Sequence, residues 1–294
     1  MKKILITGST GFIGKRLVNN LVNNNNNQIF SIIRKTGRNY KYSLKIKKKH
    51  KNFHPIFFKK NSELKKKVSN LKAEVIINLA TNFIPNPEHH QLSSILDSNV
   101  IFPTVILDNC CRNNIPKFIN LCSVAQCNKN KIDNPQNFYA LTKILFKKNM
   151  SYYQKVYPKK IFFNLYIGDS YGSNDSRKKI LPTIIRNYRR NKTTTILTKN
   201  LKLNILHVND IVNGIKILTK SIKSSGDYFI KSRNQFDLLR VIKIFNSKAT
   251  KKVKLLWLNK KPTIIDNIKI KNIPGWKQKI NVIDYFCKDL NESN

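Results

Sequence analysis

Acidic residues are scarce in this sequence. Only 15 of the 294 residues are Asp or Glu, against 56 Lys and Arg, so the formal net charge is +41. An excess of this size favours an anionic partner: nucleic acid, an anionic membrane surface or a phosphate-bearing small substrate. The basic residues form no single stripe interleaved with aromatics, and Lys runs such as 47–49 accompany Asn runs such as 23–27. We interpret the charge as a compositional bias of the whole surface, which disfavours a nucleic-acid partner.

Cysteine is also scarce and follows no ligand pattern. The five cysteines are an odd number, and the sequence has neither a CxxC pair nor a cluster of His and Cys. This excludes a disulfide framework and a zinc site of known spacing. We therefore predict reduced thiols and no bound metal.

Long apolar runs are missing. No run approaches the roughly 20 residues that cross a bilayer, and the apolar stretch after Met1-Lys2-Lys3 ends at Thr7-Gly8, too soon for a signal peptide. We predict no membrane span and expect the protein to stay in the cytoplasm. With 40% hydrophobic residues, the chain can bury the core of one large domain or two unequal ones.

Short apolar runs alternate with helical patterns along the first half of the chain. This alternation predicts an α/β fold, a doubly wound parallel sheet of the Rossmann type. Residues 1–167 are expected to form a dinucleotide-binding domain to which 204–222 return, and 168–203 and 223–294 a smaller, partly interleaved substrate domain. The strands are predicted at 2–7, 28–33, 55–58, 75–80, 118–122 and 161–167.

Three glycines follow the first predicted strand in a GxxGxxG pattern. The segment Gly8-Ser9-Thr10-Gly11-Phe12-Ile13-Gly14 lies between that strand and a predicted helix. Glycines permit the tight turn and let a pyrophosphate approach the backbone, and the helix N-terminus supplies unpaired N–H groups with a partial positive charge. The sequence therefore predicts a dinucleotide site at this turn.

Tyr139 and Lys143 are four residues apart and would lie on one face of a helix. A neighbouring ammonium favours the phenolate, so we expect Lys143 to lower the pKa of Tyr139 from about 10 and make proton transfer feasible. In so Lys-rich a chain this spacing also arises by chance. Together with the glycine turn and Ser123, 16 positions upstream, the pair indicates a catalytic site.

These motifs resemble those of the extended short-chain dehydrogenase/reductases, the NAD-dependent epimerase/dehydratase family, over nearly the whole chain. Parts of the pattern also resemble the branch that contains CDP-abequose synthase and related 4-keto-sugar reductases. The matching pieces are the glycine turn, Asn78-Leu79-Ala80-Thr81, Asn99, Ser123, Tyr139 to Lys143, Tyr171-Gly172, His207-Val208-Asn209-Asp210 and Gly275-Trp276-Lys277.

The resemblance implies a nucleotide-sugar substrate and roles for single residues. Ser123 would hydrogen-bond the reacting oxygen, Tyr139 would be the acid/base, and Lys143 would also hold the nicotinamide ribose. Many relatives dimerise through the helix that carries Tyr139, which implies a homodimer. Further cofactor contacts are implied for Gly8, Gly11, Phe12, Ile13, Gly14, Leu79, Ala80 and Asn99, and substrate contacts for Thr81, Asp169, Arg177 and Lys202.

The end of the second predicted strand bears on the choice of cofactor. NAD-binding domains usually present Asp or Glu there to the ribose 2′-hydroxyl, whereas this chain has Arg34-Lys35. A guanidinium can grip a 2′-phosphate through two parallel hydrogen bonds. Arg34 therefore favours NADP(H), with NAD(H) as the alternative.

The residues after the fifth predicted strand narrow the reaction. Family 4,6-dehydratases carry an Asp-Glu pair where this chain has Val124-Ala125, so dehydration is disfavoured. We expect an NAD(P)-dependent oxidoreductase that reduces a 4-keto sugar, with a 4-epimerase as the alternative. Leu203 stands where the family has an Arg for the substrate diphosphate. That departure and the high charge are compatible with a third alternative, a non-catalytic structural or RNA-associated dinucleotide-binding protein, against which Ser123, Tyr139 and Lys143 argue.

Overall fold

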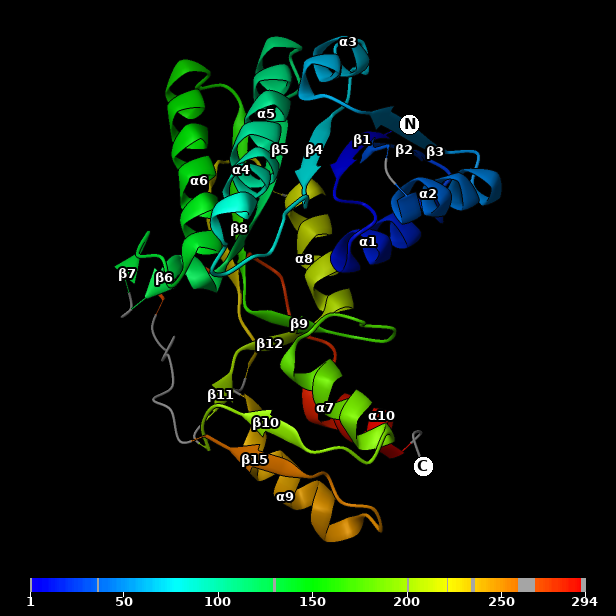
Figure 1. The fold of residues 1–294 in the computed structure, drawn as a ribbon. Helices are drawn as coiled ribbons and strands as arrows, with labels where there is room; N and C mark the ends of the chain where they lie inside the picture. Colours follow the sequence, from blue (N-terminus) through cyan, green and yellow to red (C-terminus); the bar gives the residue numbers. More distant parts are fainter. Residues whose placement is uncertain are drawn as a thin grey trace.

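Short runs rich in Ile, Val and Phe form a parallel sheet of seven strands in the order β3-β2-β1-β4-β5-β8-β13 (Figure 1). The computed structural model describes residues 2–35, 37–128, 131–199, 201–220, 222–233, 236–258 and 268–291, without the side chains of 37, 38, 202, 289 and 291. The strands are β1 (Lys2–Thr7), β2 (Asn27–Arg34), β3 (Phe53–Phe58), β4 (Val75–Asn78), β5 (Lys117–Ser123), β8 (Ile161–Ile167) and β13 (Gly226–Ile230).

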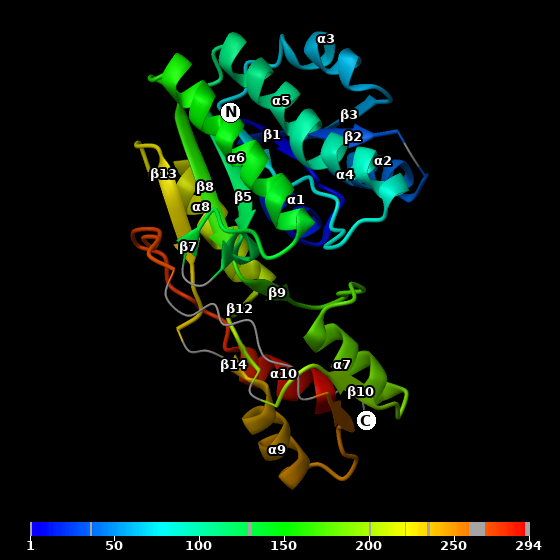
Figure 2. The ribbon, with the colours of Figure 1, turned by 60° about the vertical axis from the view of Figure 1, so that its left-hand side comes forward.

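Helices cover both faces of this sheet (Figures 1 and 2). One face carries α1 (Phe12–Val22), α2 (Gly37–Lys49) and α8 (Val208–Lys220). The other carries α3 (Leu64–Val68), α5 (Phe102–Arg112) and α6 (Phe138–Val156), with α4 (Leu92–Leu96) and the π-helical segment η3 (Asp97–Ile101) leading into α5. The predicted doubly wound parallel fold is thereby confirmed. Short 3₁₀ segments are η1 (Asn61–Glu63), η2 (His89–Gln91) and η4 (Val124–Gln126).

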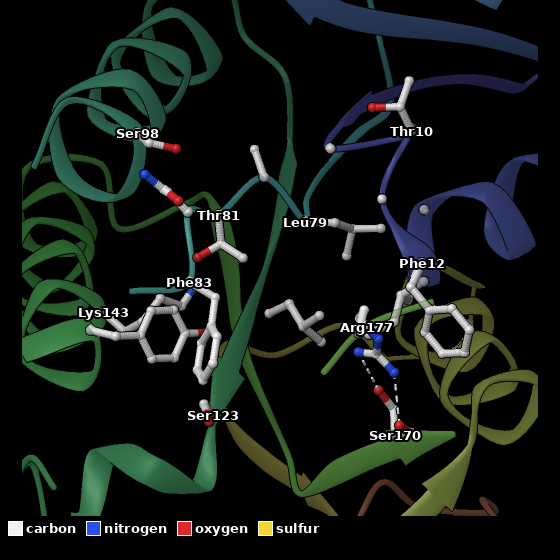
Figure 3. Close-up of a pocket in the computed structure, with 18 of the residues that line it drawn as sticks. Thr10, Phe12, Leu79, Thr81, Phe83, Ser98, Ser123, Lys143, Ser170 and Arg177 are labelled. Atoms are coloured by element: carbon white, nitrogen blue, oxygen red, sulfur yellow. Dashed lines mark hydrogen bonds between the residues drawn. The ribbon is translucent and has the colours of Figure 1, made fainter. Parts of the chain in front are cut away.

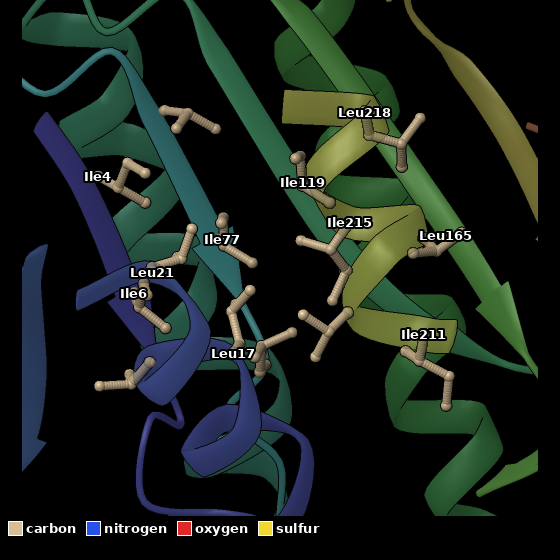
Figure 4. Packing of buried hydrophobic residues seen from close by; sticks show 14 of the residues in the cluster. Ile4, Ile6, Leu17, Leu21, Ile77, Ile119, Leu165, Ile211, Ile215 and Leu218 are labelled. Carbon is tan, nitrogen blue, oxygen red and sulfur yellow. The ribbon is translucent and has the colours of Figure 1, made fainter. Parts of the chain in front are cut away.

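Alternation along the strands divides the core between the two faces. Ile4 and Ile6 of β1 pack with Leu17 of α1 and Ile215 of α8 (Figure 4), whereas Leu5 points to the α5 and α6 side. Thr7 therefore shares the face of Leu5. This side of the sheet is mainly apolar until its carboxyl end, where polar side chains appear.

The remaining elements lie beyond the carboxyl ends of the strands (Figure 2) and have an apolar cluster of their own. Two short parallel strands, β9 (Asp169–Tyr171) and β12 (Ile205–His207), join them to the sheet. The others are α7 (Ile180–Arg189), β10 (Thr194–Ile196), β11 (Lys202–Leu203), β14 (Phe236–Asp237), α9 (Leu238–Lys248), β15 (Leu255–Trp257) and α10 (Val282–Asn291), and a hairpin of β6 (Cys127–Asn128) and β7 (Lys131–Ile132) precedes α6.

Two strands depart from the expected organisation. β13 comes from 223–294, which the prediction assigned to the smaller domain, yet it pairs with β8 as the edge strand of the large sheet. β12, in the predicted returning stretch 204–222, pairs with β9 outside that sheet. Pairing partners far apart in the chain leave no local pattern, which explains both differences. The wider division into two domains stays a prediction.

No helix in the described ranges is both long enough and apolar enough to span a bilayer.

Candidate active site

A cavity of about 770 Å³ opens at the carboxyl ends of the strands, where β1 and β4 lie side by side and their connections turn to opposite faces (Figure 3). The glycine turn, the segments after β4, β5 and β8, and the start of α6 surround it. The structure brings most predicted site residues together here. They are Gly8, Gly11, Phe12, Ile13, Gly14, Arg34, Leu79, Ala80, Thr81, Ser123, Tyr139, Lys143, Asp169 and Arg177.

The glycine turn leaves no room for side chains. Gly8 has φ +68°, and a Cβ there would lie 2.5 Å from the backbone nitrogen of Ala80. A Cβ on Gly14 would overlap the carbonyl oxygen of Gly8. Helix α1 begins directly after Gly11 without a side-chain cap or an acidic residue in its first turn. The turn thus presents backbone N–H groups and a positive helix end, which suits the pyrophosphate of a dinucleotide.

Arg177 lies on the same side of the cavity as this turn (Figure 3). Its guanidinium carbon is 3.9 Å from the ring centroid of Phe12, the first residue of α1. It donates to Ser170 Oγ at 3.1 Å and to Asp175 Oδ2 at 2.7 Å. Arg177, for which a substrate contact was predicted, therefore packs on Phe12, and its donors are engaged by Ser170 in β9 and by Asp175 in the segment after β9.

Arg34 lines the cavity at the end of β2 but is not alone there. Its Nη2 is 2.8 Å from Asp97 Oδ2, and Asn61 Nδ2 donates to the other carboxylate oxygen at 2.7 Å. The guanidinium also lies over the ring of Phe58, 5.5 Å from its centroid. No acidic residue directly follows β2 or β3, and the carboxylate beside Arg34 comes from η3.

Asn99 does not line the cavity, although a cofactor contact was predicted for it. It is buried in η3, and its amide group accepts from the backbone N–H of Asn82 at 2.7 Å. It also donates to Asn82 O at 2.9 Å and to Thr142 Oγ1 at 3.0 Å. Thr81 Oγ1 donates to the same amide oxygen. Asn99 holds the loop after β4 in place because η3 packs its inner side against α6.

Tyr139 and Lys143 share the inner face of α6, with only 8% and 4% of their surfaces exposed. Burial raises the pKa of Tyr139 to about 12 and lowers the pKa of Lys143. The expected lowering of the Tyr139 pKa by Lys143 is thus wrong for this state. The Tyr139 ring meets the Phe83 ring edge to face, with 4.8 Å between the centroids, and desolvation of the phenolate by burial is the main cause of the raised pKa.

Ser123 ends β5 and lines the same cavity as Phe83 and Lys143 (Figure 3). Its Oγ accepts from the backbone N–H of Ala125 at 3.2 Å, which anchors the side chain as the cap of η4. Accepting this bond does not consume the hydroxyl proton, which can be donated to a ligand.

Phe83 and Lys179 are among the cavity residues that the sequence reasoning did not predict. Phe83 is 51% exposed and packs on Tyr139, and Lys179 Nζ is 4.6 Å from the Phe83 centroid and 2.8 Å from Asp169 Oδ1. An isolated Phe and one more Lys carry no motif, so no signal could have found them. The side chain of Lys202, a predicted substrate contact, lies outside the described part; its backbone belongs to β11.

Among the residues described, no group of three or more His, Cys, Asp or Glu side chains comes together in a way that could hold a metal ion. The cysteines are free, and four of them, Cys110, Cys111, Cys122 and Cys127, are buried.

Residues 4–230 match the NAD dependent epimerase/dehydratase family. The chain belongs to this family. Membership confirms the resemblance drawn from the motifs and the prediction of an enzyme of the extended short-chain dehydrogenase/reductase type. The family is NAD dependent, so membership also confirms the prediction that the cofactor is a nicotinamide dinucleotide.

Several of the proteins that this chain is similar to are named for nucleotide sugars. CDP-abequose synthase of Yersinia pseudotuberculosis is 27% identical over 230 residues, 77% of this chain and 75% of the relative. UDP-glucuronic acid 4-epimerase of Bacillus cereus, solved with UDP-glucuronic acid and NAD, has a TM-score of 0.80 at 17% identity, covering 99% of this chain and 100% of that one. dTDP-glucose 4,6-dehydratase of Bacillus anthracis, solved with NAD, has a TM-score of 0.80 at 17% identity, covering 100% and 97%. At such identities the structural likeness shows the shared fold.

Proposed function

We propose that this protein is an NAD(P)-dependent oxidoreductase that reduces a 4-keto nucleotide sugar. The carrying observation is that Ser123, Tyr139 and Lys143 line the same cavity as the glycine turn. The 27% identity to CDP-abequose synthase supports the nucleotide-sugar substrate. Phe12 and Lys143 lie on opposite sides of the cavity (Figure 3), and its volume of about 770 Å³ lies within the range of ligand-binding pockets.

The side chains suit the reductive direction. Bound NAD(P)H would supply the hydride. Tyr139, which burial keeps protonated, would donate its proton to the carbonyl oxygen of the sugar, and Ser123 would hydrogen-bond that oxygen. Lys143, one helical turn away, would stabilise the phenolate that the transfer leaves behind. Val124-Ala125 offer no acid and base for removal of water, so the set supports redox chemistry without dehydration.

For the cofactor we propose NADP(H). Arg34, the last residue of β2, lines the cavity, and the next residue is Lys35 and not a carboxylate. The ion pair with Asp97 sets a condition on this choice, since a 2′-phosphate must compete with Asp97 for the guanidinium. NAD(H) stays the alternative, because its binding needs no change in that pair.

A homodimer is proposed from an apolar stripe on α6. Leu141, Leu145, Tyr152 and Val156 are all at least 36% exposed and follow helical spacing on one side of the helix. Ile101 at the end of η3 is 52% exposed. An isologous contact with the same stripe of a second copy would cover these side chains.

The test is oxidation of NADPH and NADH with a 4-keto nucleotide sugar, run with the parent and with Tyr139→Phe. We expect the variant to lose roughly 10²- to 10⁴-fold in kcat, the usual contribution of a positioned acid. Equal rates for parent and variant would overturn the proposal. Interconversion of 4-epimers without net NAD(P)H consumption would support the 4-epimerase instead, and tight RNA binding at physiological salt without turnover would support the non-catalytic reading.

A further inference from the structure

Polar side chains cross five neighbouring strands of the sheet in one row. Each is the register partner of the next, on the face that carries α5 and α6. Thr7 Oγ1 donates to Asn78 Oδ1 at 2.6 Å, and Asn78 Nδ2 to Asn120 Oδ1 at 3.1 Å. Asn120 Nδ2 donates to Asn164 Oδ1 at 3.1 Å, and Asn164 Nδ2 to Asp227 Oδ1 at 3.0 Å. We call these five residues the polar row.

One end of the polar row meets the glycine turn. Thr7 directly precedes Gly8, and Thr7 Oγ1 accepts from the backbone N–H of Ala80 at 3.2 Å. Ala80 lines the cavity, and its nitrogen is the atom against which Gly8 packs. The hydrogen bond from Ala80 N–H to Thr7 Oγ1 therefore ties the loop after β4, which lines the cavity, to the end of β1.

The other end meets the helix of the proposed proton donor. Lys147 Nζ is 3.0 Å from Asp227 Oδ2, and its side chain is only 12% exposed. Lys147 follows Lys143 by one helical turn and Tyr139 by two, on the same face of α6. Midway along the row, Asn120 Nδ2 also donates to Cys122 Sγ at 3.3 Å, and Cys122 lines the cavity.

All bonds of the row run in one direction, from Ala80 to Asp227. Asparagine can both donate and accept, so its amide could be turned over, but a carboxylate only accepts and must be the last member. Asp227 therefore fixes the orientation of every amide before it. Thr7, Asn78 and Asn120 are at most 1% exposed, so water cannot replace a partner, and each hydrogen bond polarises the next.

We propose that Asp227 is a positioning residue for the reaction: through the polar row it fixes the loop at Ala80, and through Lys147 it fixes α6. The loop at Ala80 and the side chain of Tyr139 are thereby held at a fixed distance from each other, although Asp227 contacts neither. This inference rests on the proposed function of Tyr139 and Lys143 for its kinetic part only.

A matched pair of variants tests the proposal in the full-length chain. Asp133 Oδ1 is 3.3 Å from Lys147 Nζ, and Asp133 is not a member of the polar row. Asp227→Asn and Asp133→Asn each remove one carboxylate from Lys147. Only Asp227→Asn also changes the last acceptor of the polar row. Asn is also tolerated at position 133, where φ is +60°.

The first readout needs no substrate. Backbone hydrogen exchange at Ala80 is expected to be about tenfold faster in Asp227→Asn than in the parent, since loss of the fixed acceptor loosens each bond in turn. In Asp133→Asn it is expected to stay within about twofold of the parent. Equal exchange in both variants, whether fast or slow, would overturn the proposal.

The second readout is kcat with NAD(P)H and a 4-keto nucleotide sugar. Asp227→Asn should lower kcat about tenfold at an unchanged thermal midpoint, and Asp133→Asn should change it less than about twofold. Lys147→Met should match Asp227→Asn, and Lys147→Arg should restore most of the rate because it keeps the charged contact. Altered exchange at Ala80 with an unchanged kcat would overturn the positioning role. Absence of turnover in the parent would instead count against the proposed function, and the exchange results would still decide whether Asp227 acts on the loop.

Discussion

Arg34 and Asp97 are 63 residues apart in the chain and form an ion pair of 2.8 Å on the wall of the cavity. Both side chains are partly exposed, 46% and 32%, so the pair contributes little to stability and can be exchanged for another partner. The carboxylate oxygen that faces away from Arg34 accepts from Asn61. The ion pair therefore lowers the positive charge that Arg34 would present to the ribose of a bound cofactor.

Asp97→Asn is expected to favour NADPH over NADH. Removal of the competing carboxylate leaves the Arg34 guanidinium to the 2′-phosphate, and we expect the ratio of NADPH to NADH affinity to rise about tenfold. Arg34→Leu should weaken NADPH about tenfold and leave NADH nearly unchanged. Fluorescence titration with both reduced cofactors measures this. If Asp97→Asn changed the NADPH and NADH affinities by the same factor, the proposed competition between Asp97 and the 2′-phosphate for Arg34 would be wrong.

Much of the fold and part of the site followed from local sequence. The glycine turn, the buried strands and the Tyr139–Lys143 spacing are local patterns, and the structure places them where the patterns indicate. Asp97 beside Arg34, Phe83 over Tyr139 and the polar row join residues from different strands and loops. Such contacts depend on register and topology, which leave no trace in a window of neighbouring residues. The same limit applies to the pKa of Tyr139: the Tyr–Lys spacing predicts a neighbouring ammonium but does not predict the burial that raises the pKa.

Gly8→Ala should abolish cofactor binding. The added Cβ would lie 2.5 Å from the Ala80 nitrogen, and φ at this position is +68°, so the turn must move. We expect a loss of about 2 kcal/mol or more in the free energy of unfolding and no measurable NAD(P)H binding. Gly226→Ala is the control, because its Cβ would find its nearest neighbour at 3.6 Å. Urea unfolding and cofactor fluorescence report the two effects, and normal binding by Gly8→Ala would contradict the role of the turn.

The reduction rate should fall at alkaline pH because Lys143 loses its proton, before Tyr139 does. The pKa of Tyr139 is raised to about 12, so the phenol stays a donor, whereas burial lowers the pKa of Lys143 below its ordinary 10.5. A profile of kcat between about pH 6 and 11 should show one alkaline ionisation below 10.5. Lys143→Arg, slower but permanently charged, should move that limb upward. An unmoved limb in this variant would assign the ionisation elsewhere.

Leu145→Glu should convert the proposed dimer into a monomer. Leu145 is 40% exposed in the apolar stripe of α6, and a carboxylate there would have to be buried against the second copy. Leu44→Glu on α2 is a matched control, since Leu44 is also 40% exposed but lies on the opposite side of the sheet. Light scattering after gel filtration measures the mass of each. A monomeric parent, or a dimer that survives Leu145→Glu, would refute the interface.

His207 should make the fold sensitive to acid. Its ring is 5% exposed between the rings of Tyr171 and Tyr285, and its Nδ1 accepts from the backbone N–H of Asn209 at 3.2 Å. Burial lowers the pKa of His207 to about 4 from the ordinary 6.5, so between these values the unfolded chain binds a proton that the folded chain does not. Stability therefore falls as the pH is lowered from 6.5 towards 4, by on the order of 3 kcal/mol, and this contribution changes no further below 4.

His207→Asn isolates this contribution from that of the carboxylates. The variant keeps an acceptor for the Asn209 N–H but has no group that titrates in this window, so its free energy of unfolding should depend less steeply on pH between 6.5 and 4. His90→Asn, which replaces a histidine whose side chain is 72% exposed, is the matched control. Urea unfolding at several pH values gives the three slopes. If His207→Asn retained the parental slope, the acid sensitivity would have to come from groups other than the imidazole between the two tyrosines.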